Sequence, residues 1–338
     1  MKKIIAVVFI LILCIAGSSI AQKKEFRFGI ALQTLQNPWM LSLKDGAESA
    51  ASTYGNVKLF VVGAEHSTDL STQVKQVEDF IQMKLDAIGL FAIERKGILP
   101  VMEKVNRAGI PIITLGTDSD GGKRECLIAT DEVLGGKLGA EWITRALYGK
   151  GKVAILEGSP GSQSNVLRVE GFRNEIQKAK GIQIVSSLTA RFRRDEGMRV
   201  MSEILTAHPD LNAVMAVNDE MALGALETLR VRGKLKQVKL VGYNGAAEAL
   251  HQVYHGNMAA DVLQYPERMG ELFVEWAVKL CQGEKLPADL PKTQTTPPTI
   301  HIDSGVGIVD TAMLQIKVGP ALKVIQNDIK YYMGKKPI

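Results

Sequence analysis

The chain has 338 residues, of which 46% are hydrophobic and 23% are charged, and its formal net charge is +5. This composition is typical of a globular protein and excludes an intrinsically disordered chain. No basic run is interleaved with aromatic residues, so the sequence gives no sign of nucleic-acid binding. A chain of this length is expected to form two domains of ordinary size.

Residues 1–21 are predicted to be a secretory signal peptide. Two lysines form a basic start, an apolar run follows over residues 4–16, and Ser19 and Ala21 supply the small residues of a cleavage site. The apolar run is shorter than the roughly 20 residues that a membrane-spanning helix needs. We therefore expect the mature protein to be exported to the periplasm.

The cysteines leave several possibilities open. Cys14 would carry a lipid anchor in a lipoprotein signal, but Leu13 stands where a small residue is expected, so no anchor is predicted. Cys126 and Cys281 remain in the exported chain, where disulfides are allowed. Their separation in sequence is compatible both with a disulfide and with two separate buried thiols.

Short apolar runs alternate with amphipathic helical stretches along the chain. A first series, beginning with a strand, is predicted over residues 26–32, 38–53, 57–62, 70–83, 87–91, 98–107 and 110–115. A second series, beginning with a helix, is predicted over 133–147, 153–156, 166–178, 182–188, 195–207, 213–217, 221–232, 238–241, 246–253 and 259–263. Such alternation predicts parallel sheets with helices on both faces. The fold class is therefore α/β, with two doubly wound parallel-sheet lobes.

The end of the chain has a different pattern. Two prolines at 297–298 break any helix, residues 300–302 alternate like a short strand, and a short helix is predicted after Asp310. A last helix is predicted from Pro320, with apolar residues on one face. This tail either packs on a lobe or binds a partner.

Catalytic motifs are missing from the sequence. It contains no nucleophile elbow, P-loop, HExxH or CxxC motif, so no enzyme activity and no cofactor are predicted. His251 and His255 have a spacing that could suit a metal. No acidic or thiol partner is evident nearby, so we expect an exposed pair of histidines and no metal site.

Polar and aromatic residues instead follow the predicted strands, where an open α/β sheet borders its ligand crevice. Amide side chains suit neutral, hydroxyl-rich ligands because they donate and accept hydrogen bonds, and aromatic faces suit the C–H faces of sugar rings. Asn218 could equally serve only as a helix cap, and each aromatic residue could belong to the core. The candidate residues are Asn37, Trp39, Thr117, Asp118, Phe192, Asn218, Asn244 and Gln264.

From Phe26 to about Leu290 the chain resembles the type 1 periplasmic binding proteins of the ribose-binding kind. The segments that carry the resemblance are Leu35-Gln36-Asn37-Pro38-Trp39, Leu43-Lys44-Asp45-Gly46-Ala47, Ile110-Pro111-Ile112-Ile113-Thr114-Leu115, Ile128-Ala129-Thr130-Asp131-Glu132-Val133-Leu134-Gly135-Gly136-Lys137, Leu205-Thr206-Ala207-His208-Pro209-Asp210, Asn218-Asp219-Glu220-Met221-Ala222-Leu223-Gly224-Ala225 and Gly283-Glu284-Lys285. The resemblance implies a two-lobed binding protein that closes on its ligand.

The resemblance also assigns cleft positions one at a time. The asparagine before the first helix matches Asn37. Of two stacking aromatic residues, the first matches Trp39 and the second falls on Met40. The aromatic residue of the second lobe matches Phe192. The remaining two matches are the asparagine of the Asn-Asp motif at Asn218 and a glutamine at Gln264.

Other cleft positions depart from the family. Its aspartate-arginine pair after the fourth strand appears here as Gly116-Thr117, a second arginine falls on Val166, and an aspartate falls on Asn244. Arginine forks make strong, directional bonds to sugar hydroxyls. Their loss predicts weak ribose binding and favours a bulkier sugar, a polyol or a modified furanose. Asp118 is expected to take over part of the lost role.

By resemblance, the protein is expected to be a monomer that captures a sugar or polyol and delivers it to an inner-membrane ABC permease. The first lobe is predicted to comprise 25–130 plus 265–293 and the second 131–264 plus 294–338. Crossings are expected at Thr130, Tyr265 and near Thr293. Two alternatives remain: a protein that presents its ligand to a chemoreceptor or sensor kinase, and an exported enzyme on the same scaffold.

Overall fold

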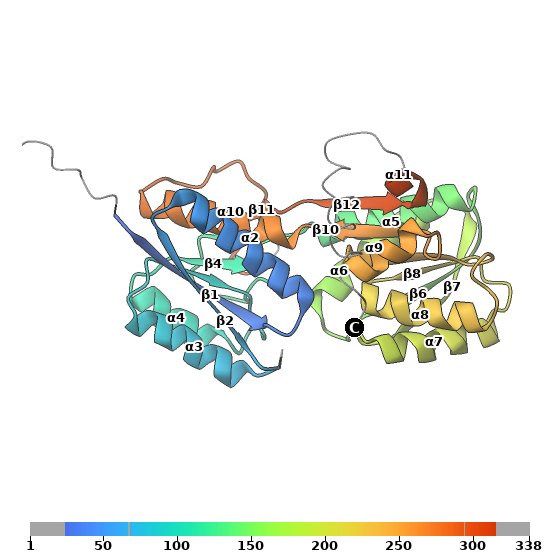
Figure 1. Ribbon diagram of the computed structural model, residues 1–338, viewed down its shortest axis with the longest axis horizontal. Helices are drawn as coiled ribbons and strands as arrows, with labels where there is room; N and C mark the ends of the chain where they lie inside the picture. The colour runs from blue at the N-terminus through green and yellow to red at the C-terminus, as the bar shows by residue number, and fades with distance from the viewer. Residues whose placement is uncertain (1–23, 67, 294, 316–338) are drawn as a thin grey trace, which may run out of the picture.

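A computed structural model describes residues 24–66, 68–293 and 295–315. They form two α/β lobes that lie side by side (Figure 1). The predicted signal peptide with Cys14, and the helix predicted from Pro320, lie outside the described residues. None of the described helices is long and apolar enough to cross a membrane.

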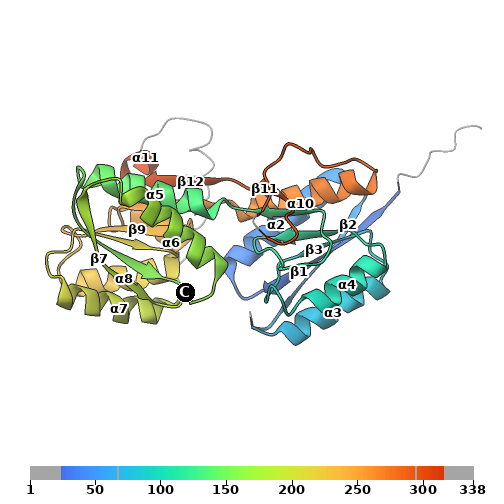
Figure 2. The same cartoon turned by 180° about the vertical axis from the view of Figure 1, so that it is seen from behind.

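The first lobe is built on a six-stranded parallel sheet with the order β11-β5-β4-β3-β1-β2. Its strands are β1 (Phe26–Thr34), β2 (Val57–Ala64), β3 (Ala87–Leu90), β4 (Ile112–Leu115), β5 (Cys126–Ala129) and β11 (Ile300–Asp303). Its helices are α2 (Pro38–Tyr54), α3 (Leu70–Gln82), α4 (Leu99–Arg107) and α10 (Pro266–Cys281). Helices α2 and α10 cover one face of the sheet, and α3 and α4 cover the other (Figure 2).

The second lobe repeats this plan with the strand order β12-β10-β9-β8-β6-β7. Its strands are β6 (Lys150–Glu157), β7 (Gly181–Thr189), β8 (Ala213–Ala216), β9 (Lys239–Asn244), β10 (Ala260–Gln264) and β12 (Val306–Asp310). Its helices are α5 (Glu132–Ala146), α6 (Gln163–Ile176), α7 (Arg194–Ala207), α8 (Asp219–Val231), α9 (Ala247–Tyr254) and α11 (Thr311–Gln315). Only β12, at the edge, runs antiparallel to its neighbour. The predicted fold class of two doubly wound lobes is confirmed.

Glycines let the main helix pairs approach closely. A Cβ on Gly46 of α2 would lie 2.1 Å from the Glu267 carbonyl oxygen of α10, and one on Gly270 of α10 would lie 2.1 Å from the Leu43 carbonyl oxygen. The same reciprocal arrangement joins α5 with α6 and α7 with α8, through Gly136, Gly171, Gly197 and Gly224. The helices of each pair therefore pack backbone to backbone at these points.

The third crossing between the lobes differs from the prediction. β11 pairs with β5 of the first sheet, so residues 300–303 belong to the first lobe, although the sequence had placed them in the second. The chain crosses at Ser304-Gly305, not near Thr293. A four-residue edge strand carries no local signal for which sheet it joins, and only the pairing with β5 decides this.

The three crossings lie against one another. The Ser304 amide donates to the Ala129 carbonyl oxygen (2.9 Å), and the hydroxyls of Thr130 and Ser304 are 3.4 Å apart. The ring of Tyr265, at the second crossing, comes within 3.1 Å of where a Cβ on Gly305 would lie. These contacts tie the crossings into one compact connection.

Two elements of the first lobe were not predicted. β5 directly precedes the crossing predicted at Thr130, and its four residues are too short to give a clear pattern. α10 has a helical apolar period and Pro266 in its first turn, so its sequence did contain a signal.

Candidate ligand-binding site

The carboxyl ends of the strands in both lobes point toward the boundary between the lobes (Figures 1 and 2). In open α/β sheets this end borders the ligand crevice, since the loops and helix starts that follow the strands meet there. Most candidate residues follow these strand ends. In the described part of the chain, no hydrogen bond joins the candidates of one lobe to those of the other.

In the first lobe, Asn37 and Trp39 begin α2. The Asn37 Oδ1 atom accepts a hydrogen bond from the Trp39 amide (2.8 Å), and Pro38 occupies the first helical turn. Met40, in contrast, is 5% exposed and packs in the core. Successive residues of a helix point about 100° apart, so Met40 and Trp39 face different surroundings, and the contact of Met40 with a ligand stays a prediction.

Asp118 also does not face the crevice. It is 1% exposed, and its carboxylate accepts hydrogen bonds from Arg124 Nε (2.6 Å), Arg124 Nη2 (2.7 Å) and Thr295 Oγ1 (2.7 Å). Burial opposes ionisation of Asp118, but the hydrogen bonds and charge of Arg124 hold its pKa below the ordinary value. The predicted ligand role of Asp118 is wrong, because Arg124 draws the carboxylate inward. Thr117, the neighbouring candidate, is half-buried.

In the second lobe, Asn218 caps α8 and positions Phe192. Its Oδ1 atom accepts from the Met221 amide (2.9 Å), and its Nδ2 donates to the Phe192 carbonyl oxygen (3.2 Å). The Phe192 ring lies where a Cβ on Gly158 would be, at 2.0 Å, so that glycine is required beside the ring. Asn218 is therefore both a cap and a neighbour of the predicted aromatic residue. Val166 is 52% exposed, which leaves it free to meet a ligand.

A polar network centred on Glu132 links the other candidates. Arg168 donates to Glu132 through Nε and Nη2, both at 2.8 Å, and the Tyr243 hydroxyl donates at 2.6 Å. Gln264 Nε2 donates to Glu132 Oε1 (3.2 Å), while Gln264 Oε1 accepts from Asn244 Nδ2 (2.7 Å). The network presents Asn244 and Gln264 together at the ends of β9 and β10.

Glu132, Arg168 and Tyr243 were missed by the sequence reading. Burial alone would lower the pKa of Arg168, but the charge and hydrogen bonds of Glu132 raise it. The Tyr243 ring also lies under the guanidinium, with its centroid 4.1 Å from Cζ, and burial beside Glu132 raises the pKa of Tyr243. Glu132 directly follows the cap Asp131, and Arg168 comes two residues after Val166, but no local pattern brings them together.

Two buried acids support the loop that carries Asn244. Asp219 accepts hydrogen bonds from the amides of Tyr243 (2.9 Å) and Ala246 (2.7 Å). Both oxygens of the neighbouring Asp261 are buried. Burial raises the pKa of both carboxyl groups, Asp219 to about 7, and the proximity of the two raises that of Asp261 further. A proton held by this pair keeps two carboxylates from facing each other beneath the site.

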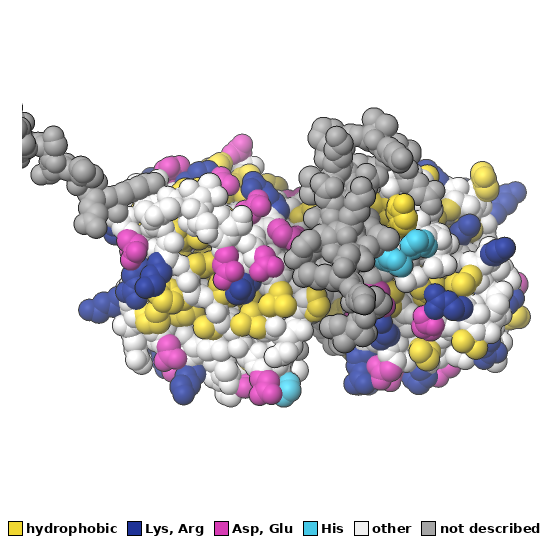
Figure 3. Space-filling model, viewed as in Figure 1, with side chains coloured by type: hydrophobic (Ala, Val, Ile, Leu, Met, Phe, Trp, Pro, Cys, Tyr) yellow, Lys and Arg dark blue, Asp and Glu magenta, His cyan; other side chains and the backbone are white. Residues whose placement is uncertain are grey.

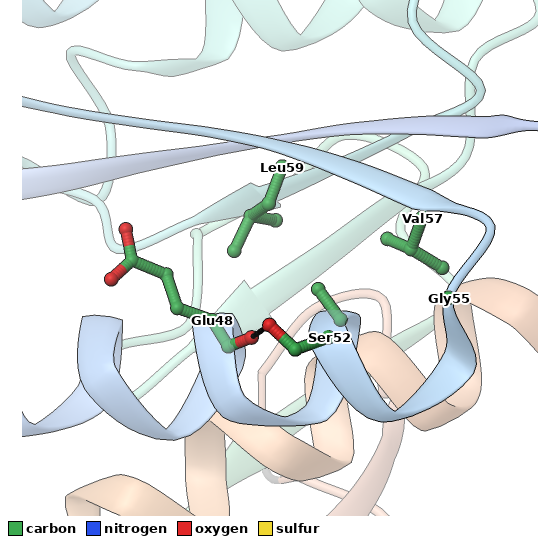
Figure 4. Close-up of a pocket in the computed structure, with 6 residues that line it drawn as sticks. Glu48, Ser52, Gly55, Val57 and Leu59 are labelled. Carbon is green, nitrogen blue, oxygen red and sulfur yellow. Dashed lines mark hydrogen bonds between the residues drawn. The ribbon is translucent and has the colours of Figure 1, made fainter.

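Two shallow hollows of the described residues lie elsewhere. One of about 510 Å³ lies between α2 and β2, lined by Glu48, Ala51, Ser52, Gly55, Val57 and Leu59 (Figure 4). It is at the end of α2 opposite to Asn37 and contains none of the candidates. A second hollow, of about 310 Å³, lies between α5 and α6. Neither hollow is lined by a residue of the predicted site.

The cysteines, a possible metal site and the surface charges complete the comparison with the sequence predictions. Cys126 and Cys281 are separate free thiols, so no disulfide joins them. Within the described ranges, no group of three or more metal-ligating side chains is found. Basic and acidic side chains are interspersed on the face of the molecule that Figure 3 shows.

Comparison with known proteins agrees with this geometry. Residues 28–285 match the model of the periplasmic binding protein domain. The chain belongs to this family. It is 38% identical to the ribose import binding protein of Bacillus subtilis over 269 residues, covering 80% of this chain and 86% of that protein. It is 34% identical to the ribose import binding protein of Escherichia coli, covering 86% of this chain and 96% of that protein.

Solved structures give the same fold. A periplasmic solute-binding protein of an ABC transporter from Actinobacillus succinogenes, with bound D-allose, has a TM-score of 0.77 and 29% identity, covering 85% of this chain and 98% of that one. A solute-binding protein from Bacillus halodurans, with bound myo-inositol, has a TM-score of 0.75 and 26% identity, covering 90% and 98%. The predicted resemblance is confirmed, and the family is one of substrate-binding transport proteins.

Proposed function

We propose that this protein is an exported solute-binding protein that captures a neutral sugar or polyol between its lobes and delivers it to an ABC permease. The observation that carries the proposal is the amide cluster of the second lobe. Asn244 and Gln264 are held side by side by the Glu132 network, and Asn218 lies at the neighbouring strand end. Amides so placed can donate to and accept from ligand hydroxyls without adding charge.

The binding preference follows from what surrounds the amides. The Glu132 and Arg168 charges neutralise each other, so this pair offers no free charge to an ionic ligand. By the resemblance described above, Val166 and Thr117 occupy positions at which the family carries arginines. We therefore expect ribose to bind weakly, even though the curated relatives include ribose import binding proteins. Sub-micromolar ribose binding in calorimetry would contradict this expectation.

The site is tested by a thermal-shift screen over sugars and polyols, followed by calorimetry on variants. A ligand that binds only the folded state raises the melting temperature. Losing one buried hydrogen bond costs about 1–3 kcal/mol, so Asn218→Ala and Gln264→Ala should each weaken binding by roughly 5- to 150-fold. His251→Ala, on α9 away from the strand ends, is the control. Equal affinity of Gln264→Ala and His251→Ala would show that the site is misplaced.

Closure is tested separately by small-angle X-ray scattering. Two lobes joined by the crossings at Thr130, Tyr265 and Ser304-Gly305 are expected to close on the ligand as a hinge. The radius of gyration should fall on addition of saturating ligand. An unchanged radius with a ligand that calorimetry shows to be bound would refute hinge closure while leaving the binding function in place.

A further inference from the structure

Two aromatic residues lie together at the strand ends of the first lobe. Phe91 directly follows β3, is 8% exposed, and is fixed by a hydrogen bond from its amide to the Ala31 carbonyl oxygen (3.0 Å). Trp39 meets it edge to face, with ring centroids 5.8 Å apart and planes at 88°. These two rings form a continuous aromatic surface at the ends of β1 and β3.

The neighbouring strand end extends this surface. Gly116, after β4, has a φ of +61°, and a Cβ built on it would lie only 2.2 Å from Cε2 of Phe91. The Phe91 ring therefore covers the α-carbon of Gly116, and no side chain fits there. The nearest carboxylate of this loop, Asp118, points inward to Arg124.

The aromatic surface has no polar atom to offer. The Trp39 Nε1 atom is buried and has no hydrogen-bond partner among the described residues, so the indole turns its apolar part outward. The second lobe, in contrast, presents Asn218, Asn244 and Gln264. A ligand held between the lobes thus meets these amides on the second lobe and, on the first, the two rings beside Asn37 and Thr117. A hydroxyl pressed against the two rings would lose its water without gaining a partner.

Resting on the proposed sugar-binding function, we propose that the ligand is a deoxy sugar, whose methyl group or unsubstituted carbon packs on Phe91, and that Phe91 sets this preference. Its hydroxyls face the amides of the second lobe. Phe91 is thereby a specificity-determining residue, with Gly116 as the residue that makes room for its ring.

The test compares sugars that differ by one hydroxyl, using isothermal titration calorimetry on the exported chain. The pairs are L-rhamnose with L-mannose, L-fucose with L-galactose, D-fucose with D-galactose, and 5-deoxy-D-ribose with D-ribose. The tightest ligand should be a deoxy sugar that binds about 10- to 100-fold more tightly than its hydroxylated parent.

Variants assign the preference to the ring. Phe91→Asn supplies a polar group and should reduce the ratio to less than about threefold, whereas Phe91→Leu keeps an apolar contact and should preserve the preference. Phe26→Leu, in the same strand layer but at the amino end of β1, is the matched control and should leave the ratio unchanged. Circular dichroism shows whether each variant folds. If Phe91→Asn does not fold, Phe91→Thr, which also brings a polar group to this position, replaces it and should reduce the ratio in the same way.

The possible results distinguish the preference for a deoxy sugar from the sugar-binding function on which it rests. A hydroxylated parent that binds as tightly as its deoxy partner overturns the inference and leaves the sugar-binding function standing. A ratio unchanged by Phe91→Asn overturns the role of Phe91. Failure of every sugar and polyol to bind overturns the proposed function itself.

Discussion

The ion pair between Glu132 and Arg168 gives a quantitative test of the second lobe. The side chains are only 12% and 7% exposed, and the bonds between them are bidentate. Removing one partner of such a pair leaves an uncompensated buried charge and costs about 3–5 kcal/mol. Glu132→Gln keeps the shape of the side chain and removes only its charge. We expect it to lower the free energy of unfolding of this lobe by that amount.

The assay is urea unfolding followed by tryptophan fluorescence. Trp142 lies on α5 of the second lobe, and the other two tryptophans, Trp39 and Trp276, lie in the first. A Trp39→Phe/Trp276→Phe background therefore reports the second lobe alone. This matters because the two lobes need not unfold in one step, and a free energy is defined only for a two-state transition.

A surface ion pair on the same helix supplies the control for this test. Glu141→Gln breaks a 3.5 Å surface pair with Lys137 on the same helix and should cost less than about 0.5 kcal/mol. Adding Arg168→Met to Glu132→Gln removes both charges and should recover part of the loss. A loss below about 1 kcal/mol for Glu132→Gln, or a double variant as unstable as the sum of the single ones, would refute the reasoning.

Two further predictions concern buried carboxyl groups. Asp219 has a pKa raised from 3.8 to about 7 by burial, so between these values the folded state holds a proton that the unfolded state loses, and stability should fall as pH rises from 4 to 7. Asp261→Asn removes the facing carboxyl group and should flatten this slope in urea unfolding at pH 5 and 7.5; an unchanged slope would contradict the assignment. Asp118→Asn should destabilise the first lobe, because Arg124 loses its buried partner, yet leave ligand affinity unchanged in calorimetry. Weaker binding without loss of stability would restore Asp118 to the site.

Much of the fold could be predicted from periodicity because each strand of these sheets is a short apolar run between amphipathic helices. The parts that could not be predicted depend on contacts distant in sequence. β11 has four residues and could join either sheet. Its position is set by pairing with β5, which precedes it in the chain by more than 170 residues. The antiparallel β12 follows at once, so the crossing shifts to the two residues between them.

The candidate site shows the same division. Asn218 could be placed at a strand end and helix start from the local sequence alone, and the structure places it there. Asp118 has an equally suggestive position, but the side chain that decides its direction is Arg124, and Thr295 completes the pocket from the far end of the chain. A strand-end position therefore predicts which residues are near a crevice, and the nearest buried counter-charge decides which of them face it.

The ion pair of Glu132 and Arg168 also depends on residues that are distant in sequence. They stand 36 residues apart and meet because Gly136 and Gly171 allow α5 and α6 to pack closely, so the pair depends on two glycines that carry no charge themselves. The pair in turn holds Gln264, which bonds Asn244. These bonds fix the orientation of Gln264 and Asn244 before any ligand arrives and leave the Asn244 Oδ1 atom to accept from it. All sugars of similar shape can use these amides, so the aromatic rings of the opposite lobe should decide which sugar is preferred.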